Sequence, residues 1–207
     1  MNETSLWDLF LRGGFIMWPL LLCSIASTAI VGERLWVLRS TRIIPKHLVS
    51  DVWGWIKNHQ MDAKRIRQIK FSSPLGRVIA SGLINAKHGR AVMRESIQDV
   101  LNHEVHKMER FVNALGTIAT ITPLLGLLGS VIGMMEMFST LMTNGAGDGS
   151  ALAGGIAVAL IATAMGLFIA IPSLFFYRLI LRRVDDLAVY MEQETIKLVE
   201  ALYDEKE

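Results

Sequence analysis

Three long stretches of the chain carry no charged residue. They cover residues 13–32, 111–135 and 149–177 and contain 20, 25 and 29 residues. A helix needs about 20 mostly apolar residues to cross the hydrocarbon core of a bilayer. The pattern therefore predicts three transmembrane helices. The predicted spans are 15–38, 111–142 and 152–177.

Apolar residues also recur every three or four positions outside the second and third spans, from Val92 to Met108 and from Ile180 to Leu202. This spacing is typical of one face of a helix. No glycine or proline interrupts either pattern where it joins its span, so we expect both spans to continue as long helices far into the cytoplasm. Residues 1–14 mix apolar and charged side chains and predict a short amphipathic helix at the membrane interface.

The region 39–110 lies between the first two spans and contains two turn-like segments, "SSPLG" and "KHGR". They divide it into predicted helices, and no segment shows the alternating pattern of a strand. The predicted helices are 45–58, 62–70, 74–85 and a long one from about Arg90. The sequence thus predicts an all-α membrane protein.

Composition and charge agree with this prediction and add an orientation. The chain is 52% hydrophobic with a mean hydropathy of +0.40, which is too apolar for an ordinary soluble domain. Of 21 Lys and Arg residues, 14 lie in 39–110, five lie in 178–207, and none lies in the turn 143–151. Basic residues stay on the cytoplasmic side. We therefore expect 39–110 and the tail 178–207 to be cytoplasmic, and the N-terminus and the turn to be periplasmic.

Two other interpretations of the charges are less well supported. A cleaved signal peptide has a positive N-terminal region, whereas Glu3 and Asp8 offset Arg12 here. The first span is therefore predicted to be an uncleaved anchor. The net charge of +2 gives no indication of nucleic-acid binding, and anionic lipid headgroups explain the basic residues better.

Signals for an enzyme or a cofactor are weak. The lone Cys23 cannot form an intramolecular disulfide, and "HEVH" at 103–106 lacks the i, i+4 histidine pair of a zinc protease. No nucleophile lies beside a base in a recognisable motif. The sequence predicts neither an enzyme nor a cofactor or metal site.

Small residues form stripes in the second and third spans. In membranes such stripes let two helices approach closely. We therefore predict that they pack helix against helix. The second span contributes Gly126, Gly129 and Gly133, and the third contributes Gly155, Ala159, Ala162, Gly166 and Ala170.

Hydroxyls accompany these stripes. Thr120 and Ser130 share a face with Leu124 and Leu127, and Thr163 lies on the stripe of the third span. If these faces meet, they form a mildly polar surface without charge. Glu136 is the one carboxylate of the second span; it lies either at the outer interface or at the mouth of a cation path.

Three motifs resemble the ExbB/TolQ/MotA proton-channel family. They are "ERLWVL" at 33–38, "TPLLGLLGSVIGMMEMF" at 122–138 and "GGIAVALIATAMGLFIAIP" at 154–172. The similarity covers nearly the whole chain. Three spans fit ExbB and TolQ better than the four-span MotA type, and the short N-terminus is most similar to the compact ExbB of secondary TonB systems.

The resemblance implies an inner-membrane energy converter. In that family a homopentamer surrounds the transmembrane helices of an ExbD-like dimer, whose aspartate carries the proton, and the motor energises TonB for outer-membrane uptake of iron-siderophores. Ser130 and Thr163 match the hydroxyls of the family motifs, which makes them the first candidates for the pore, with Thr120 and Glu136 beside them. Val158 stands where many ExbB and TolQ proteins have glutamate. A TolQ-like role in envelope integrity and a non-conducting membrane scaffold are the alternatives.

Overall fold

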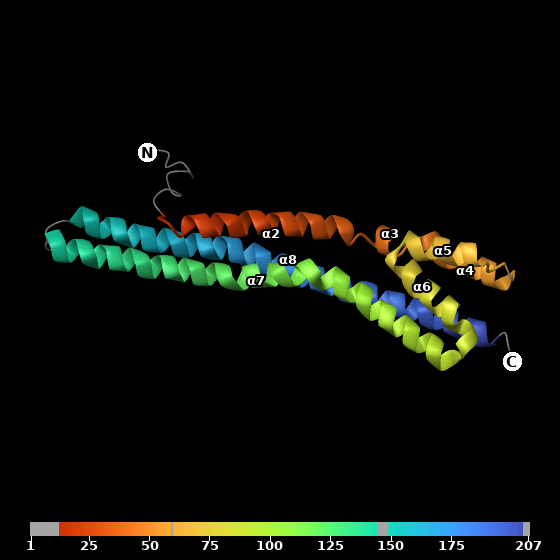
Figure 1. Ribbon diagram of the computed structural model, residues 1–207. Coiled ribbons are helices and arrows are strands. Elements are labelled where there is room, and N and C mark those ends of the chain that lie inside the picture. Colours follow the sequence, from red (N-terminus) through yellow and green to blue (C-terminus); the bar gives the residue numbers. More distant parts are fainter. Residues whose placement is uncertain (1–12, 59, 145–148, 205–207) are drawn as a thin grey trace. The chain divides into compact units, whose positions relative to one another are not determined.

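The computed structural model describes residues 13–58, 60–144 and 149–204, and in these residues it contains helices and no strand (Figure 1). Three helices are long and apolar enough to cross a membrane, so the predicted all-α class with three spanning helices is confirmed. The amphipathic helix predicted over 1–14 lies almost wholly outside the described residues. The elements are α2 (Met17–Val37), α3 (Ser40–Ile43), α4 (Lys46–Lys57), α5 (Ala63–Ser72), α6 (Pro74–Asn85), η1 (Ala86–His88), α7 (Arg90–Asn144) and α8 (Gly149–Asp204).

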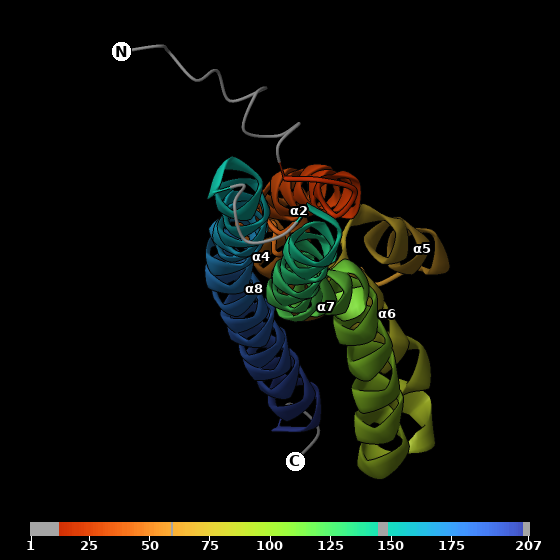
Figure 2. The ribbon, with the colours of Figure 1, turned by 90° about the vertical axis from the view of Figure 1, so that its left-hand side faces the viewer.

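The chain divides into two compact units, and α7 and α8 contribute to both. The first unit contains the chain up to Gly32 and residues 112–178. Figures 1 and 2 show α2 lying against α7 and α8 there. Its apolar core is formed by Ile16, Met17, Leu20 and Ile169, with Leu125, Ile132, Ile161 and Met165 packed against it.

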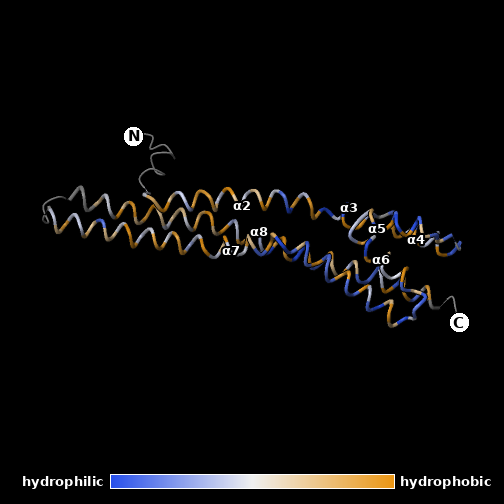
Figure 3. Tube along the Cα trace, in the orientation of Figure 1, coloured by the Kyte–Doolittle hydropathy of each residue, from blue (hydrophilic) through white to orange (hydrophobic). Residues whose placement is uncertain are grey.

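The helices α7 and α8 are each continuous over more than 50 residues. Pro123 and Pro172 lie inside them without ending them. Figure 3 shows hydrophobic residues dominating α7 and α8 in the first unit and hydrophilic residues becoming frequent beyond it. The long continuous helices that the sequence predicts are therefore present.

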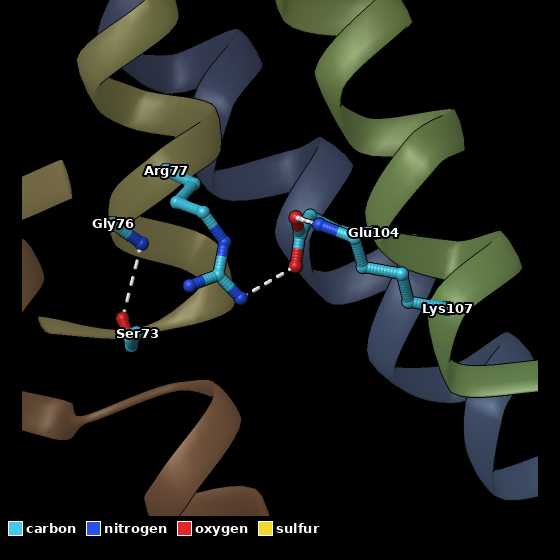
Figure 4. A network of polar contacts seen from close by, with 5 residues as sticks. All are labelled: Ser73, Gly76, Arg77, Glu104 and Lys107. Carbon is cyan, nitrogen blue, oxygen red and sulfur yellow. Dashed lines mark hydrogen bonds and ion pairs between the residues drawn. The ribbon is translucent and has the colours of Figure 1, made fainter. Parts of the chain in front are cut away.

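The second unit contains residues 33–111 and 179–207, described here to 204. Local capping explains where its short helices begin. The Asp62 carboxylate accepts from the Ala63 amide at the start of α5, and the Ser73 hydroxyl accepts from the Gly76 amide at 3.0 Å at the start of α6 (Figure 4). Pro74 occupies the first turn of α6, where its missing N–H costs nothing. The observed boundaries of α4, α5 and α6 lie within two residues of those predicted.

A buried carboxylate joins α6 to α7 in this unit (Figure 4). Glu104 is only 4% exposed, and it accepts from the Arg77 guanidinium at 2.6 Å and from the Lys107 ammonium at 3.0 Å. Burial by itself raises the pKa of Glu104, but the hydrogen bonds and charges of Arg77 and Lys107 outweigh it and lower the pKa below the ordinary value. Glu104 is thus held ionised, which stabilises the packing of α6 on α7.

The end of α2 is attached to α7 by Arg34, whose side chain is 6% exposed. The Arg34 guanidinium donates to the Met108 carbonyl at 3.2 Å and pairs with Glu33 at 2.8 Å. It also lies over the Phe111 ring, 4.8 Å from its centre. The "ER" of the motif "ERLWVL" therefore has a structural role at this end of the first span.

Candidate functional site

The small residues of α7 and α8 face one another at close range. A Cβ added at Gly166 would lie 2.7 Å from the Thr122 carbonyl oxygen, and one added at Gly133 would lie 2.9 Å from the Ala159 amide nitrogen. Only a hydrogen in place of the side chain permits backbones this close. Similar short approaches surround Gly126, Gly129 and Gly155.

Two hydroxyls lie within this contact, between the glycines of the two helices. The Ser130 hydroxyl is 3.0 Å from the Ala159 carbonyl of α8 and 3.3 Å from the Gly126 carbonyl of its own helix. The Thr163 hydroxyl is 3.1 Å from Ala159 and 3.4 Å from Gly126, and the two hydroxyls also contact each other. We call Ser130, Thr163 and the carbonyls of Gly126 and Ala159 the hydroxyl cluster.

The hydroxyl cluster has fewer protons than acceptors. Each hydroxyl has one proton to donate, yet both carbonyls and the other hydroxyl are within reach of it. The two protons can therefore be arranged in several ways without moving either helix. Ser130 and Thr163 are only half-buried, so a polar group approaching from outside the chain can compete for these protons. The arrangement suits a surface that solvates a changing charge without carrying one.

Thr120 and Glu136 are not part of this cluster. Thr120 is exposed and its hydroxyl donates to the Gly116 carbonyl of its own helix at 2.9 Å. Leu124 and Leu127, which share a face with Thr120, are 60% and 59% exposed. Glu136 is also exposed, and its carboxylate makes no ion pair or hydrogen bond within the described residues. Of the four predicted pore residues, the structure brings only Ser130 and Thr163 together.

A second polar contact in the first unit was not predicted. The buried hydroxyls of Ser27 in α2 and Ser173 in α8 are 2.6 Å apart. They border a cavity of about 230 Å³ that Ser24 and Thr28 also line. The sequence carried one sign of this contact, because the apolar first span contains three hydroxyl side chains within five positions, 24 to 28. No pattern in α2 alone could show which of them meets α8.

Metal ligation has no obvious place in the described part of the chain. There, no three residues among His, Cys, Asp and Glu lie close enough together to hold an ion. His103 and His106 are exposed residues of α7 outside the predicted span. The hydroxyl cluster and the Ser27–Ser173 contact consist of hydroxyls and backbone carbonyls.

Comparison with known proteins adds a family to this geometry. The model of the MotA/TolQ/ExbB proton channel family matches residues 70–193, which include the hydroxyl cluster. The chain is 32% identical to the putative biopolymer transport protein ExbB-like 1 of Synechocystis over 84% of this chain and 69% of that protein. It is 30% identical to the biopolymer transport protein exbB1 of Vibrio cholerae over 82% of this chain and 76% of that protein. The Tol-Pal system protein TolQ of Haemophilus influenzae is 41% identical over 41% of this chain and 37% of its own length.

Proposed function

The chain belongs to the MotA/TolQ/ExbB proton channel family, and from that premise we propose that it is the ExbB-like subunit of a proton-driven motor. The motor contains several copies of this chain, a pentamer by family resemblance, and an ExbD-like partner with a transmembrane aspartate. It energises a TonB-like protein for the uptake of iron-siderophores and similar cargo through the outer membrane.

The observation that carries this proposal is the hydroxyl cluster on the glycine-lined contact of α7 and α8. A carboxylate that loses its proton inside a membrane needs polar partners, because an isolated charge in hydrocarbon costs several kcal/mol. Ser130 and Thr163 offer protons that can turn from a carbonyl toward such a carboxylate and back again. Val158 stands where many family members have a glutamate, so this chain offers no acid at that position. The proton carrier in this proposal is the partner's aspartate, with Glu136 as a helper at the outer side.

The proposed setting is a bacterial inner membrane. The distribution of Lys and Arg supports a periplasmic N-terminus and turn 143–151, with cytoplasmic 39–110 and 178–207. In this orientation the second unit is cytoplasmic apart from residues 33–38 and 111, which belong to the first and second predicted spans. The surface of α7 formed by Thr120, Leu124 and Leu127 is exposed in the single chain. In the proposed motor it faces neighbouring copies or the partner helices.

Removing both hydroxyls tests the proposal. Ser130→Ala with Thr163→Val takes away the two O–H groups, and valine closely matches the shape of threonine. The matched control is Ser139→Ala with Thr140→Val on α7, where the Thr140 hydroxyl donates only to its own helix. TonB-dependent siderophore uptake is measured in cells. Native mass spectrometry shows whether each complex still assembles with its ExbD-like partner.

We expect the Ser130/Thr163 variant to lose uptake with its complex intact, while the control retains it. Normal uptake by the Ser130/Thr163 variant would refute a role for the cluster in energy conversion and favour a non-conducting scaffold.

A TolQ-like function is the second candidate, because the local identity to a TolQ reaches 41%. It predicts a leaky outer membrane, and no siderophore phenotype, when the gene is deleted.

A further inference from the structure

A groove opens in the second unit where α8 leaves the third span. Its volume is about 630 Å³, within the range of small-molecule sites. Two elements form it: the segment around α3 and the first turns of α8 beyond the span. The lining residues are Ser40, Ile44, Leu179, Arg182, Arg183, Asp186, Leu187 and Tyr190.

The groove combines free positive charge with apolar walls. Arg182 and Arg183 are exposed, and neither makes an ion pair or hydrogen bond within the described residues. Ser40 and Tyr190 add hydroxyl donors. Ile44, Leu179 and Leu187 provide apolar surface, and Leu187 is only 5% exposed. Asp186 is the one acid of the lining, so the charge is positive overall.

Along the chain, the groove begins where the third predicted span ends. Arg178 is the first charge after the uncharged stretch of the third span, and the lining begins at the next residue, Leu179. The end of the first span also carries residue types that are typical of the membrane interface. Trp36 is 54% exposed there, and the Arg42 guanidinium lies over its ring at 3.9 Å. Tryptophan and arginine gather at the level of the lipid headgroups.

We propose that this groove binds an anionic glycerophospholipid. Arg182 and Arg183 would hold the phosphate, since guanidinium groups pair with phosphate oxygens through several N–H donors. The hydroxyls of Ser40 and Tyr190 donate to the remaining oxygens, and the apolar walls cover the glycerol end of the acyl chains. The ligand comes from the leaflet that surrounds this end of the span.

The test measures lipid retained by the assembled complex. The complex is purified in nanodiscs of equal phosphatidylglycerol and phosphatidylcholine, and bound lipid is identified by native mass spectrometry. We expect the wild type to retain phosphatidylglycerol. Arg182→Gln with Arg183→Gln should lower this retention about thirtyfold, because each arginine near an anionic lipid surface contributes about 1 kcal/mol of attraction. Asp186→Asn should raise it, because it removes the one opposing charge.

The matched control is Arg110→Gln with Arg178→Gln. It removes two arginines that border the second and third spans, and neither lines the groove. We expect it to change retention less than threefold. Equal losses in both double variants would mean that general surface charge attracts the lipid, which would overturn the site. Each variant is first shown to keep the oligomeric mass of the wild type.

Two further results would overturn the proposal. Soluble glycerol phosphate that displaces the lipid at millimolar concentration would identify a free-phosphate site in place of a lipid site. A thiol cross-link between copies of the chain, formed through Tyr190→Cys, would show a second copy seated in the groove. This inference does not depend on the proposed motor function, since lipid retention is measured without uptake.

Discussion

Replacing Gly166 by alanine places one methyl group between two helix backbones. The added Cβ would lie 2.7 Å from the Thr122 carbonyl oxygen and 3.0 Å from the Gly126 Cα, where ordinary van der Waals contact begins at 3.4 Å. Both neighbours are backbone atoms of α7, so no side chain can turn away. The helices must separate by about 0.7 Å at this level. Overpacking of this kind costs about 1–3 kcal/mol, against a gain of about 1 kcal/mol from the better helix propensity of alanine.

The same helix offers a matched control in Gly154, where an added Cβ meets nothing within 4 Å. Gly154→Ala should leave the free energy of unfolding unchanged or raise it by up to about 1 kcal/mol. We expect Gly166→Ala to lower it by up to about 2 kcal/mol, the overpacking cost less the propensity gain, in a detergent titration followed by circular dichroism. It should also weaken siderophore uptake, since the Thr163 hydroxyl contacts the Gly126 carbonyl across this gap. If the two variants unfold at the same detergent fraction, the close approach of α7 and α8 at Gly166 is wrong.

Three other perturbations have defined outcomes in the same titration. Glu104→Gln should cost about 1–3 kcal/mol, because the buried partner of Arg77 loses its charge. Folding lowers the pKa of Glu104, so the ionised carboxylate contributes its full stabilisation above the ordinary pKa of 4.5 and loses it as the pH falls through the folded-state pKa. On acidification the wild type should therefore lose more stability than Glu104→Gln, and equal losses would contradict this. A double-mutant cycle of Ser27→Ala and Ser173→Ala should give a coupling of about 0.6 kcal/mol, and zero coupling would mean that the contact contributes nothing. Arg34→Lys should cost about 1–2 kcal/mol, since one ammonium cannot replace a forked guanidinium, and wild-type stability would contradict that.

The candidate site shows where prediction from the sequence reaches its limit. Ser130 and Thr163 were identified by their place in two motifs, and the structure brings them into contact. Thr120 was predicted to share a face with Ser130, yet it lies on the exposed side of α7. A hydroxyl in a helix has the same local pattern whether it meets another helix or not, because it can always donate to its own i−4 carbonyl. Ser27 was not singled out for the same reason.

What the sequence by itself determined is whatever depends on neighbouring residues along the chain. The uncharged stretches fix three spans, and unbroken apolar spacing fixes the length of α7 and α8. Ser73 and Pro74 fix the start of α6, since capping satisfies amides within one turn. Only the tertiary structure decided the rotation and register of α7 against α8. Those depend on backbones approaching through glycines far apart in the sequence, such as Gly126 with Gly166 and Gly133 with Gly155, and no local pattern records which glycine meets which carbonyl.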